Sequence, residues 1–248
     1  MPDQVAPPRA LAAVVDAFWQ HDGDEQRLRI LPDGCMDFIF DLESGTARLI
    51  GAMTEASVVD IPRGTRSLGV RFLPGAAAAY LTEPSNAFTD DGAPLDELSL
   101  TRRFGLAERV AETTDHGERR RLIAEFLLLG AARVRAPDPR VRRAAKLLRA
   151  HSGPGAVRSV SRELGLGERQ LERLFSAHVG IGPKAFARVA RFERALALMN
   201  GPLRGQATLA AAAGYSDESH LIREFRALAR ATPAELARER RVGFVQAE

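Results

Sequence analysis

The sequence predicts an α+β N-terminal domain, a small antiparallel β-rich unit plus helices, followed by an all-α domain with two helix-turn-helix units joined by a long helix. Three observations predict this. Apolar residues alternate in short runs within residues 27–73, whereas after residue 137 they recur every three or four positions. Residues 1–137 hold 15 Lys and Arg against 21 Asp and Glu, whereas residues 138–248 hold 20 against 11. One short amphipathic helix pattern also occurs twice in the C-terminal half.

Length and composition favour two globular domains. The chain has 248 residues, of which 45% are hydrophobic and 27% charged. The longest uncharged run, Gly205–Ser216, has 12 residues and is too short to span a membrane. The first residues lack the basic start and long apolar core of a signal peptide, and the single cysteine, Cys35, cannot form an internal disulfide. We therefore expect a cytoplasmic protein with no membrane partner.

A proline-rich border separates the two predicted domains, 1–137 and 138–248. In "RAPDPR", Pro137 ends the preceding helix, while Asp138 and Pro139 suit the N-cap and the first position of the next helix. The net charge is −6 before this border and +9 after it. A basic half joined to an acidic half indicates that the C-terminal half alone meets a polyanion, although a solvated basic surface gives the same balance.

The C-terminal half begins with a helix over residues 139–150, and a short helix follows the "HSGPG" stretch. Gly165 then lies where a sharp turn needs positive φ. In the next helix, over residues 167–179, one face is apolar: Leu171, Leu174, Phe175 and His178. About 200° away on a helix of about 3.6 residues per turn lies a polar face: Arg169, Glu172, Arg173 and Ser176. This layout is that of a helix-turn-helix, although a single copy is also typical of ordinary solvent-facing helices.

The same pattern recurs 50 residues later. The matching positions are Leu171, Arg173, Phe175, Ala177 and Pro183, which correspond to Leu221, Arg223, Phe225, Ala227 and Pro233. The turn glycines, Gly165 and Gly214, are 49 residues apart, so the second turn is one residue longer. A long helix over residues 183–200 joins the copies. Two such units can present recognition helices to successive major grooves, which lie about 34 Å apart on one duplex.

Residues of roughly 138–240 resemble the DNA-binding domain of AraC/XylS-type bacterial transcription regulators. The stretches "SRELGLGERQLERLFSAHVGIGPKAFARVARFERALALM" and "LAAAAGYSDESHLIREFRALARATPAEL" carry the resemblance. The second is the more specific, because Gly-Tyr-Ser-Asp precedes Phe225 and a late Thr-Pro pair. The resemblance implies a sequence-specific regulator that contacts DNA through Arg169, Gln170, Glu172 and Arg173 in the first unit and through Glu218, Ser219, Ile222 and Arg223 in the second.

Within this set, Arg169 and Arg173 best suit bidentate contact with guanine, while backbone amides and other arginines fix the register on phosphates. The sequence departs from the family pattern at Gln206, where an apolar residue is usual, and at Arg230, where a helix-ending glycine is usual. Besides double-stranded DNA, the candidate partners are RNA polymerase, a small-molecule effector of unknown structure and a second copy of the chain. We expect no cofactor and no metal.

The N-terminal half predicts a β-hairpin in "RLRILPDGCMDFIFDL", with Leu28 and Ile30 on one strand and Met36, Phe38 and Phe40 on the other. The turn falls at residues 32–34. Further strands are expected at 47–50, 57–61 and 67–73, and helices from Pro74, over 102–114 and over 118–133. The last helix carries an apolar line that is either core or an interface: Leu122, Ile123, Phe126 and Leu127. The "RRR" at 119–121 fits a solvated face or a partner for the acidic N-terminal surface.

The stretches "LPDG…DFIF" and "GVRFLPGA" resemble an uncharacterised N-terminal domain that precedes this DNA-binding unit in some such regulators. In the wider family this position holds a sensing or dimerising domain. The resemblance therefore implies a sensing or dimerisation role for residues 1–137.

The chain shows no enzyme motif: there is no Gly-rich phosphate loop, no nucleophile elbow and no paired carboxylates. The five histidines are scattered without metal-ligand spacing. Two alternatives remain beside the regulator. One is a thiol-dependent sensor or alkyl-transfer protein with Cys35 as its reactive centre and an accessory DNA-binding domain, although a lone cysteine beside an apolar strand is more often a packing residue. The other is a nonspecific nucleoid-type binder.

Overall fold

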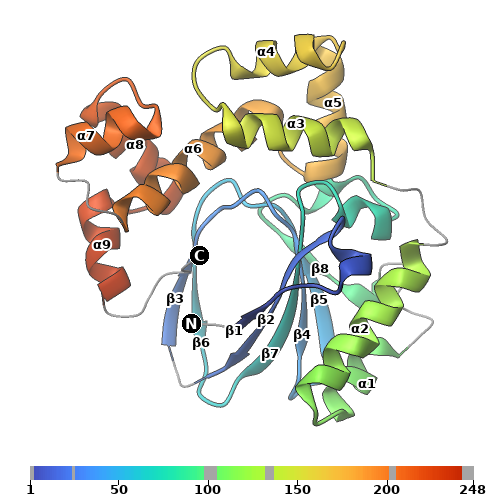
Figure 1. The fold of residues 1–248 in the computed structure, drawn as a ribbon. Helices are drawn as coiled ribbons and strands as arrows, with labels where there is room; N and C mark the ends of the chain where they lie inside the picture. Colours follow the sequence, from blue (N-terminus) through green and yellow to red (C-terminus); the bar gives the residue numbers. More distant parts are fainter. Residues whose placement is uncertain (1–2, 24–25, 98–104, 132–136, 201–204, 242–248) are drawn as a thin grey trace.

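The computed structural model describes residues 3–23, 26–97, 105–131, 137–200 and 205–241. An antiparallel β-rich half comes first, and a helical half lies across one end of it (Figure 1). The predicted order of an α+β domain followed by an all-α domain is therefore confirmed. Within the described ranges, no helix combines the length and the apolar character needed to cross a membrane.

The described residues of the N-terminal half form two sheets. The larger is antiparallel, with the order β1 (Asp3–Val5), β2 (Val15–Asp22), β7 (Arg66–Phe72), β4 (Asp37–Asp41), β5 (Thr46–Ile50) and β8 (Gly92–Pro94). The smaller pairs β3 (Gln26–Ile30) with β6 (Ser57–Ile61). In Figure 1 this two-stranded ribbon stands opposite the larger sheet.

Alternation along the strands gives the larger sheet two different faces. In β4, Phe38 and Phe40 are buried, while Asp37 and Ile39, which alternate with them along the strand, line a cavity. The Phe38 ring packs edge-to-face on Phe72 with 4.7 Å between centroids, and Tyr80 lies 5.4 Å from Phe72. Helices α1 (Leu106–Glu112) and α2 (His116–Ala131) cover this apolar side (Figure 1).

The predicted hairpin is wrong, although both of its strands exist. β3 pairs with β6, and β4 pairs with β5 and β7, so the chain crosses from one sheet to the other between β3 and β4. The turn at residues 32–34 forms, with Gly34 at φ +71°, but it packs against the helical half. A Cβ on Gly34 would lie 2.6 Å from the Phe186 ring. Alternation predicts strands but does not specify their partners, and here the turn between β3 and β4 lies against a residue far along the chain.

The helices of the N-terminal half differ from the expectation in detail. After Pro74 only a short 3₁₀ helix forms, Ala77–Tyr80. The helix expected at 102–114 is α1, and residues 102–104 lie outside the described ranges. In α2 the whole apolar line is buried, so it is core and not an interface: Leu122, Ile123, Phe126 and Leu127.

The arginines at 119–121 lie in different environments. Arg119 is buried and donates hydrogen bonds to the carbonyls of Val110 and Thr113, so it joins α2 to the end of α1. Arg121 is exposed and pairs with Glu118 and Glu125 on its own helix. Of Arg119 and Arg121, only Arg121 fits the expected solvated face.

The C-terminal half repeats one unit, as predicted. The helices are α3 (Pro139–Ala150), α4 (Ala156–Glu163), α5 (Glu168–Val179), α6 (Pro183–Met199), α7 (Gln206–Ala213), α8 (Glu218–Ala229) and α9 (Pro233–Arg241). Gly165 and Gly214 both have positive φ, +64° and +89°. The residue after each glycine donates to a carbonyl five positions back, from Leu166 to Ser161 and from Tyr215 to Ala210, both at 2.9 Å. The first helix of each unit therefore ends in the same way, and the second turn is one residue longer, since α5 begins three residues after Gly165 and α8 four residues after Gly214.

The long helix α6 supports both units through a matched pair of aromatic contacts. Phe175 of α5 packs edge-to-face on Phe186, with 5.3 Å between centroids. Phe225 of α8 packs on Phe192 in the same way at 4.8 Å. All four rings are buried. Because both partner rings belong to one helix, α6 is a shared support for α5 and α8.

Arg230 adopts the conformation of the glycine that the family pattern places there. It ends α8 at φ +53°, and Gly180, 50 positions earlier, ends α5 at φ +97°. A non-glycine residue in the left-handed region is strained. Arg230 makes an exposed ion pair with Glu55, which compensates little.

Arg230→Gly should consequently melt at or above the wild-type temperature, and about 2–4 °C above Arg230→Ala, which keeps the strain and loses the ion pair. Thermal unfolding of the three proteins measures this. An alanine variant at least as stable as the glycine variant would show that the ion pair, and not the backbone, controls this position.

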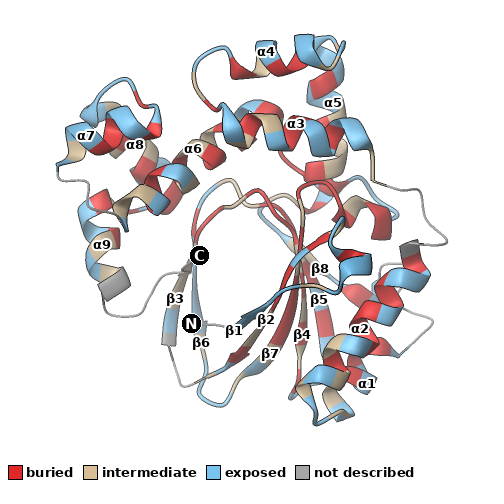
Figure 2. Cartoon of the chain, viewed as in Figure 1, coloured by how far each residue is buried: buried red, intermediate tan, exposed pale blue. Residues whose placement is uncertain are grey.

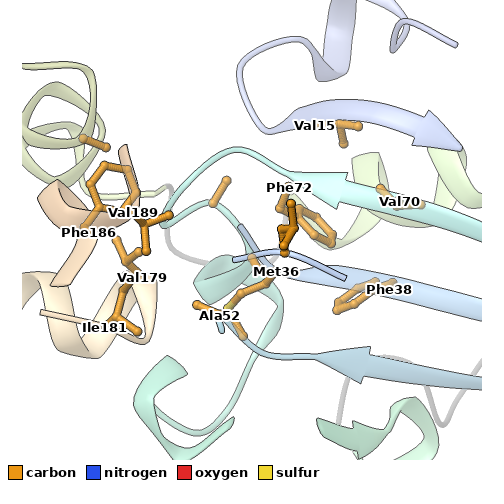
Figure 3. Close-up of a cluster of buried hydrophobic side chains, with 14 of the residues drawn as sticks. Val15, Met36, Phe38, Ala52, Val70, Phe72, Val179, Ile181, Phe186 and Val189 are labelled. Carbon is orange, nitrogen blue, oxygen red and sulfur yellow. The ribbon is translucent and has the colours of Figure 1, made fainter. Parts of the chain in front are cut away.

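The two halves pack on each other through apolar side chains. Figure 2 shows buried segments where the helices α3, α5 and α6 meet the ends of the strands. In the close-up of Figure 3, Val179, Ile181 and Phe186 of the helical half face Met36 and Ala52 of the β-rich half. Buried residues of both halves belong to one continuous core. The helices that carry the recognition units therefore pack directly on the N-terminal half.

Candidate nucleic-acid interface

The residues predicted to contact DNA lie on the outer sides of α5 and α8. The exposed ones are Arg169, Gln170, Glu172, Arg173, Glu218, Ser219 and Arg223, and Ile222 is half-buried. On the inner sides, Leu171 and Leu221 are fully buried. The carboxylate of Glu172 lies against Gly182, at the turn before α6. The amphipathic pattern therefore separates a packed face from a free polar face in both helices.

The start of α8 is fixed by a local capping network. Asp217 accepts a hydrogen bond from the His220 backbone N–H at 2.7 Å, and Ser216 Oγ donates to its other oxygen at 2.9 Å. These bonds, and more weakly the nearby charge of Arg223, lower the pKa of Asp217. The ionised carboxylate stabilises the positive end of the helix. The capping network thereby sets the direction in which Glu218 and Ser219 leave the helix.

A second contact attaches α8 to α6. Arg188 donates to both carboxylate oxygens of Glu224, with nitrogen–oxygen distances of 2.9 and 3.0 Å. The Glu224 side chain is only 14% exposed. Such a bidentate pair restrains rotation of one helix about the other more than a single hydrogen bond does.

The N-terminal half binds the C-terminal end of both recognition helices at equivalent positions. Ser85 Oγ donates to the carbonyl of His178 at 2.8 Å, and the backbone N–H of Ala56 donates to the carbonyl of Leu228 at 2.7 Å. Residues 178 and 228 are again 50 positions apart. The last carbonyls of a helix have no partner within the helix, so these donors satisfy them from outside. These contacts could not be predicted from the sequence, because a serine hydroxyl or a backbone N–H that donates to a distant carbonyl has no recognisable sequence pattern.

Two arginines form ion pairs between the N-terminal half and the end of α8 or α9. Arg29 of β3 binds both oxygens of Glu239 in α9 at 2.9 Å and also donates to the carbonyl of Ala229 at 3.0 Å. Arg230 pairs with Glu55 at 2.6 Å. We call Arg29, Glu55, Ala56, Arg230 and Glu239 the α8 clamp. Its members come from both halves of the chain.

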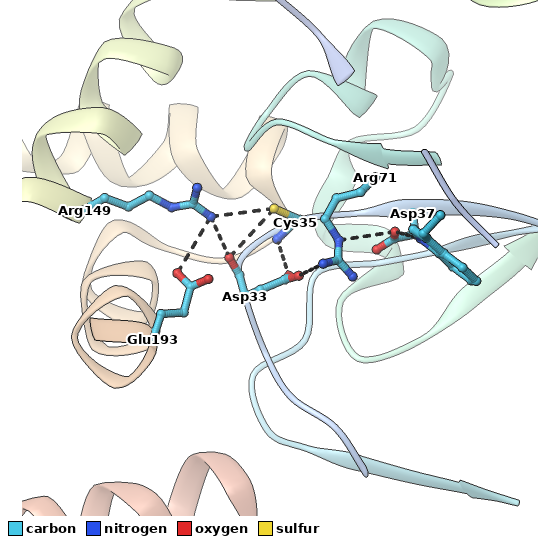
Figure 4. A network of polar contacts seen from close by, with 7 residues as sticks. Asp33, Cys35, Asp37, Arg71, Arg149 and Glu193 are labelled. Atoms are coloured by element: carbon cyan, nitrogen blue, oxygen red, sulfur yellow. Dashed lines mark hydrogen bonds and ion pairs between the residues drawn. The ribbon is translucent and has the colours of Figure 1, made fainter. Parts of the chain in front are cut away.

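Cys35 lies in a polar network between the halves (Figure 4). Arg149 of α3 donates to the carbonyl of Asp33 at 3.0 Å and lies 3.7 Å from Cys35 Sγ. Asp33 and Asp37 both pair with Arg71, at 3.3 and 3.4 Å. Cys35 is buried, and burial raises the pKa of its thiol well above the usual range. Reactive thiols are exposed and have a lowered pKa, so this environment does not favour the thiol-centred alternative.

A cavity of about 580 Å³ lies between the two sheets and reaches the helical half. Apolar side chains of both sheets line it, among them Leu28, Ile39 and Ile50. Arg29, Glu55 and Arg230 of the α8 clamp are also part of its lining. The sequence predicted Leu28 on one strand of a hairpin, whereas the structure places it on the wall of this cavity.

Two family models match separate parts of the chain. Residues 3–94 match a family described as a domain of unknown function, DUF6597, and residues 160–239 match one described as a helix-turn-helix domain. No curated protein matches the chain.

Several solved structures are similar. A crystal structure of ToxT from Vibrio cholerae is 10% identical, with a TM-score of 0.48, covering 88% of this chain and 96% of that one. A ToxT structure with bound unsaturated fatty acid is 11% identical, with a TM-score of 0.46 and coverages of 90% and 93%. An AraC-type regulator from Chromobacterium violaceum is 27% identical, with a TM-score of 0.39, covering 41% of this chain and 92% of that one.

The duplicated turns, the two free polar helix faces and the match over residues 160–239 define a DNA-binding protein of the helix-turn-helix class. More narrowly, its C-terminal domain is a helix-turn-helix domain of the AraC type, the family of transcription regulators that the sequence resembles.

Proposed function

We propose that this protein is a cytoplasmic, non-enzymatic transcription regulator that reads two successive major grooves of one DNA duplex with α5 and α8. The observation that carries the proposal is the matched support of both helices on α6, through Phe186 and Phe192. Each helix presents a polar outer face while its packed face is fixed. Within these faces we assign base contacts to Arg169, Gln170, Glu172 and Arg173 and to Glu218, Ser219, Ile222 and Arg223.

We assign residues 138–248 to DNA binding and residues 1–137 to regulation by sensing or dimerisation. The cavity supports a sensing role, because its volume lies in the range of about 300–1,000 Å³ that small-molecule sites occupy. Its lining includes Arg29 and Arg230 of the α8 clamp. An effector bound there would contact residues that hold the second recognition helix.

The full chain should select a duplex site from a random library and bind it at least about a thousandfold more tightly than bulk DNA, as specific regulators do. Affinity should fall steeply with salt, because each phosphate contact releases condensed counterions. Competition with bulk DNA measures this preference. Equal affinity for the selected site and for bulk DNA would instead indicate the nonspecific nucleoid-type binder.

A matched pair of fragments tests the domain assignment. Residues 138–248 carry the +9 charge and both recognition helices, so they should bind the selected duplex at low salt, whereas residues 1–137 should not. DNA binding by residues 1–137 alone would overturn the assignment.

A further inference from the structure

A groove of about 590 Å³ separates the first helix-turn-helix unit from the second. One wall is the loop before α4, Ser152–Gly155, together with the first residues of that helix, and the other wall is α8 at His220 and Glu224. The floor is one face of α6. The groove adjoins both predicted base-contacting faces, because its lining also includes Glu168, which precedes Arg169 at the start of α5, and because His220 follows Ser219 on α8.

The floor of the groove is basic. Lys184, Arg188 and Arg191 follow each other on α6 at spacings of four and three, so they lie on one side of the helix. With Arg158 on the wall there are four cationic side chains, against the two carboxylates of the lining, Glu168 and Glu224. The groove therefore has an excess of two positive charges when His220 is neutral.

Two of these cations remain available for a ligand. Glu224 neutralises Arg188, and Glu168 pairs with Arg158 at 3.3 Å. Lys184 is exposed, and no carboxylate among the described residues forms an ion pair with it or with Arg191. The Arg191 guanidinium lies over the Tyr215 ring at 5.2 Å, which restricts its position. The Nε atom of Arg191 is buried and has no hydrogen-bond partner in the described part of the protein.

The backbone of the wall adds further positive potential. Gly155 precedes α4 at φ +77°, and no side chain of the described residues caps that helix, although the Ala156 N–H donates to the carbonyl of Gly153. The first N–H groups of an uncapped helix attract anions. A Cβ at Gly153 or Gly155 would meet no atom of the described residues within 4 Å, so these residues leave this part of the wall open to a bulky ligand.

We infer that this groove binds the sugar-phosphate backbone of the DNA segment between the two major grooves, with Lys184 and Arg191 as its phosphate-contacting residues. The inference rests on the proposed function. When two recognition helices enter successive major grooves, a minor groove with its two rows of phosphates lies between them. The basic side of α6 lies between the same two helices. These contacts fix the register of the duplex and carry no base preference.

The test uses the full chain and a duplex of about 30 base pairs obtained by site selection, which is long enough for two turns of about 10.5 base pairs. Lys184→Gln should lower the slope of log affinity against log salt by about 1 and weaken binding roughly threefold to tenfold at low salt. The base preference in site selection should stay unchanged. Arg194→Gln is the matched control, because Arg194 is an exposed arginine on α6 outside the groove.

Neutral methylphosphonates in the central segment of the duplex locate the contact. They should weaken binding by the wild-type protein more than binding by Lys184→Gln. Arg191→Gln, checked for folding by circular dichroism, should behave like Lys184→Gln. If the wild type prefers the selected duplex but Lys184→Gln and Arg191→Gln keep its salt slope, the groove inference is wrong and the proposed function stands. If the wild type shows no preference over bulk DNA, the proposed function itself fails.

Discussion

Arg173→Ala is expected to cost on the order of 1–3 kcal/mol of binding free energy on the preferred site and to relax base preference in one half of that site. Arg173 is exposed on the outer face of α5, and no carboxylate of the described residues forms an ion pair with it. Its guanidinium is therefore free to bind guanine through two hydrogen bonds. Site selection with the variant, followed by titration on the wild-type site, measures both effects.

Arg223→Ala is the informative comparison. Arg223 is also exposed, but its charge acts on Asp217 at the start of α8, and its neighbour Ile222 can do little beyond touching a thymine methyl. We expect a smaller loss that is spread more evenly over sequences, as for a phosphate contact. Lys146→Ala on α3 serves as an exposed cationic control. A loss of specificity confined to Arg223→Ala, with Arg173→Ala unchanged, would reverse the proposed order of the two helices.

The helical half could be predicted because its signals are local. Helix periodicity, the Asp138–Pro139 start, the turn glycines and the repeat at 50 positions all lie within short stretches, and each has the predicted geometry in the structure. Gln206 and Arg230 were the exceptions to the pattern. Gln206 leaves its Oε1 buried without a partner in the described ranges, and Arg230 adopts the conformation of a glycine.

The N-terminal half could be predicted only as a set of elements. Five of its strands were expected, but their pairing joins residues far apart in the sequence, such as those of β3 with β6 and of β4 with β7. For the same reason neither the α8 clamp nor the cavity could be expected. The groove between the two units is an intermediate case: the spacing of Lys184, Arg188 and Arg191 on one helix was visible, but the walls that make it a groove were not.

Arg29→Ala is expected to weaken the contact between the N-terminal half and the second recognition helix. Arg29 is 18% exposed and makes three hydrogen bonds to α8 and α9, so its loss should lower the free energy of unfolding by about 1–3 kcal/mol. Arg27→Ala is the matched control on the same strand. Arg27 is 72% exposed and pairs only loosely with Asp60, at 3.6 Å, and such pairs contribute little.

The α8 clamp also bears on the spacing between the two half-sites that the protein accepts. If the α8 clamp fixes the separation of α5 and α8, each base pair inserted between the two half-sites turns one of them by about 34° away from its helix. The wild type should then lose roughly tenfold in affinity or more for one inserted base pair, comparable to a mismatch. Arg29→Ala and Glu239→Gln should lose clearly less, because a released second unit can follow the displaced half-site. Affinities for duplexes with spacers changed one base pair at a time decide this. Identical spacer profiles for wild type and Arg29→Ala, alongside a measured loss of stability, would mean that α6 alone sets the distance and that the clamp serves only to hold the two halves together.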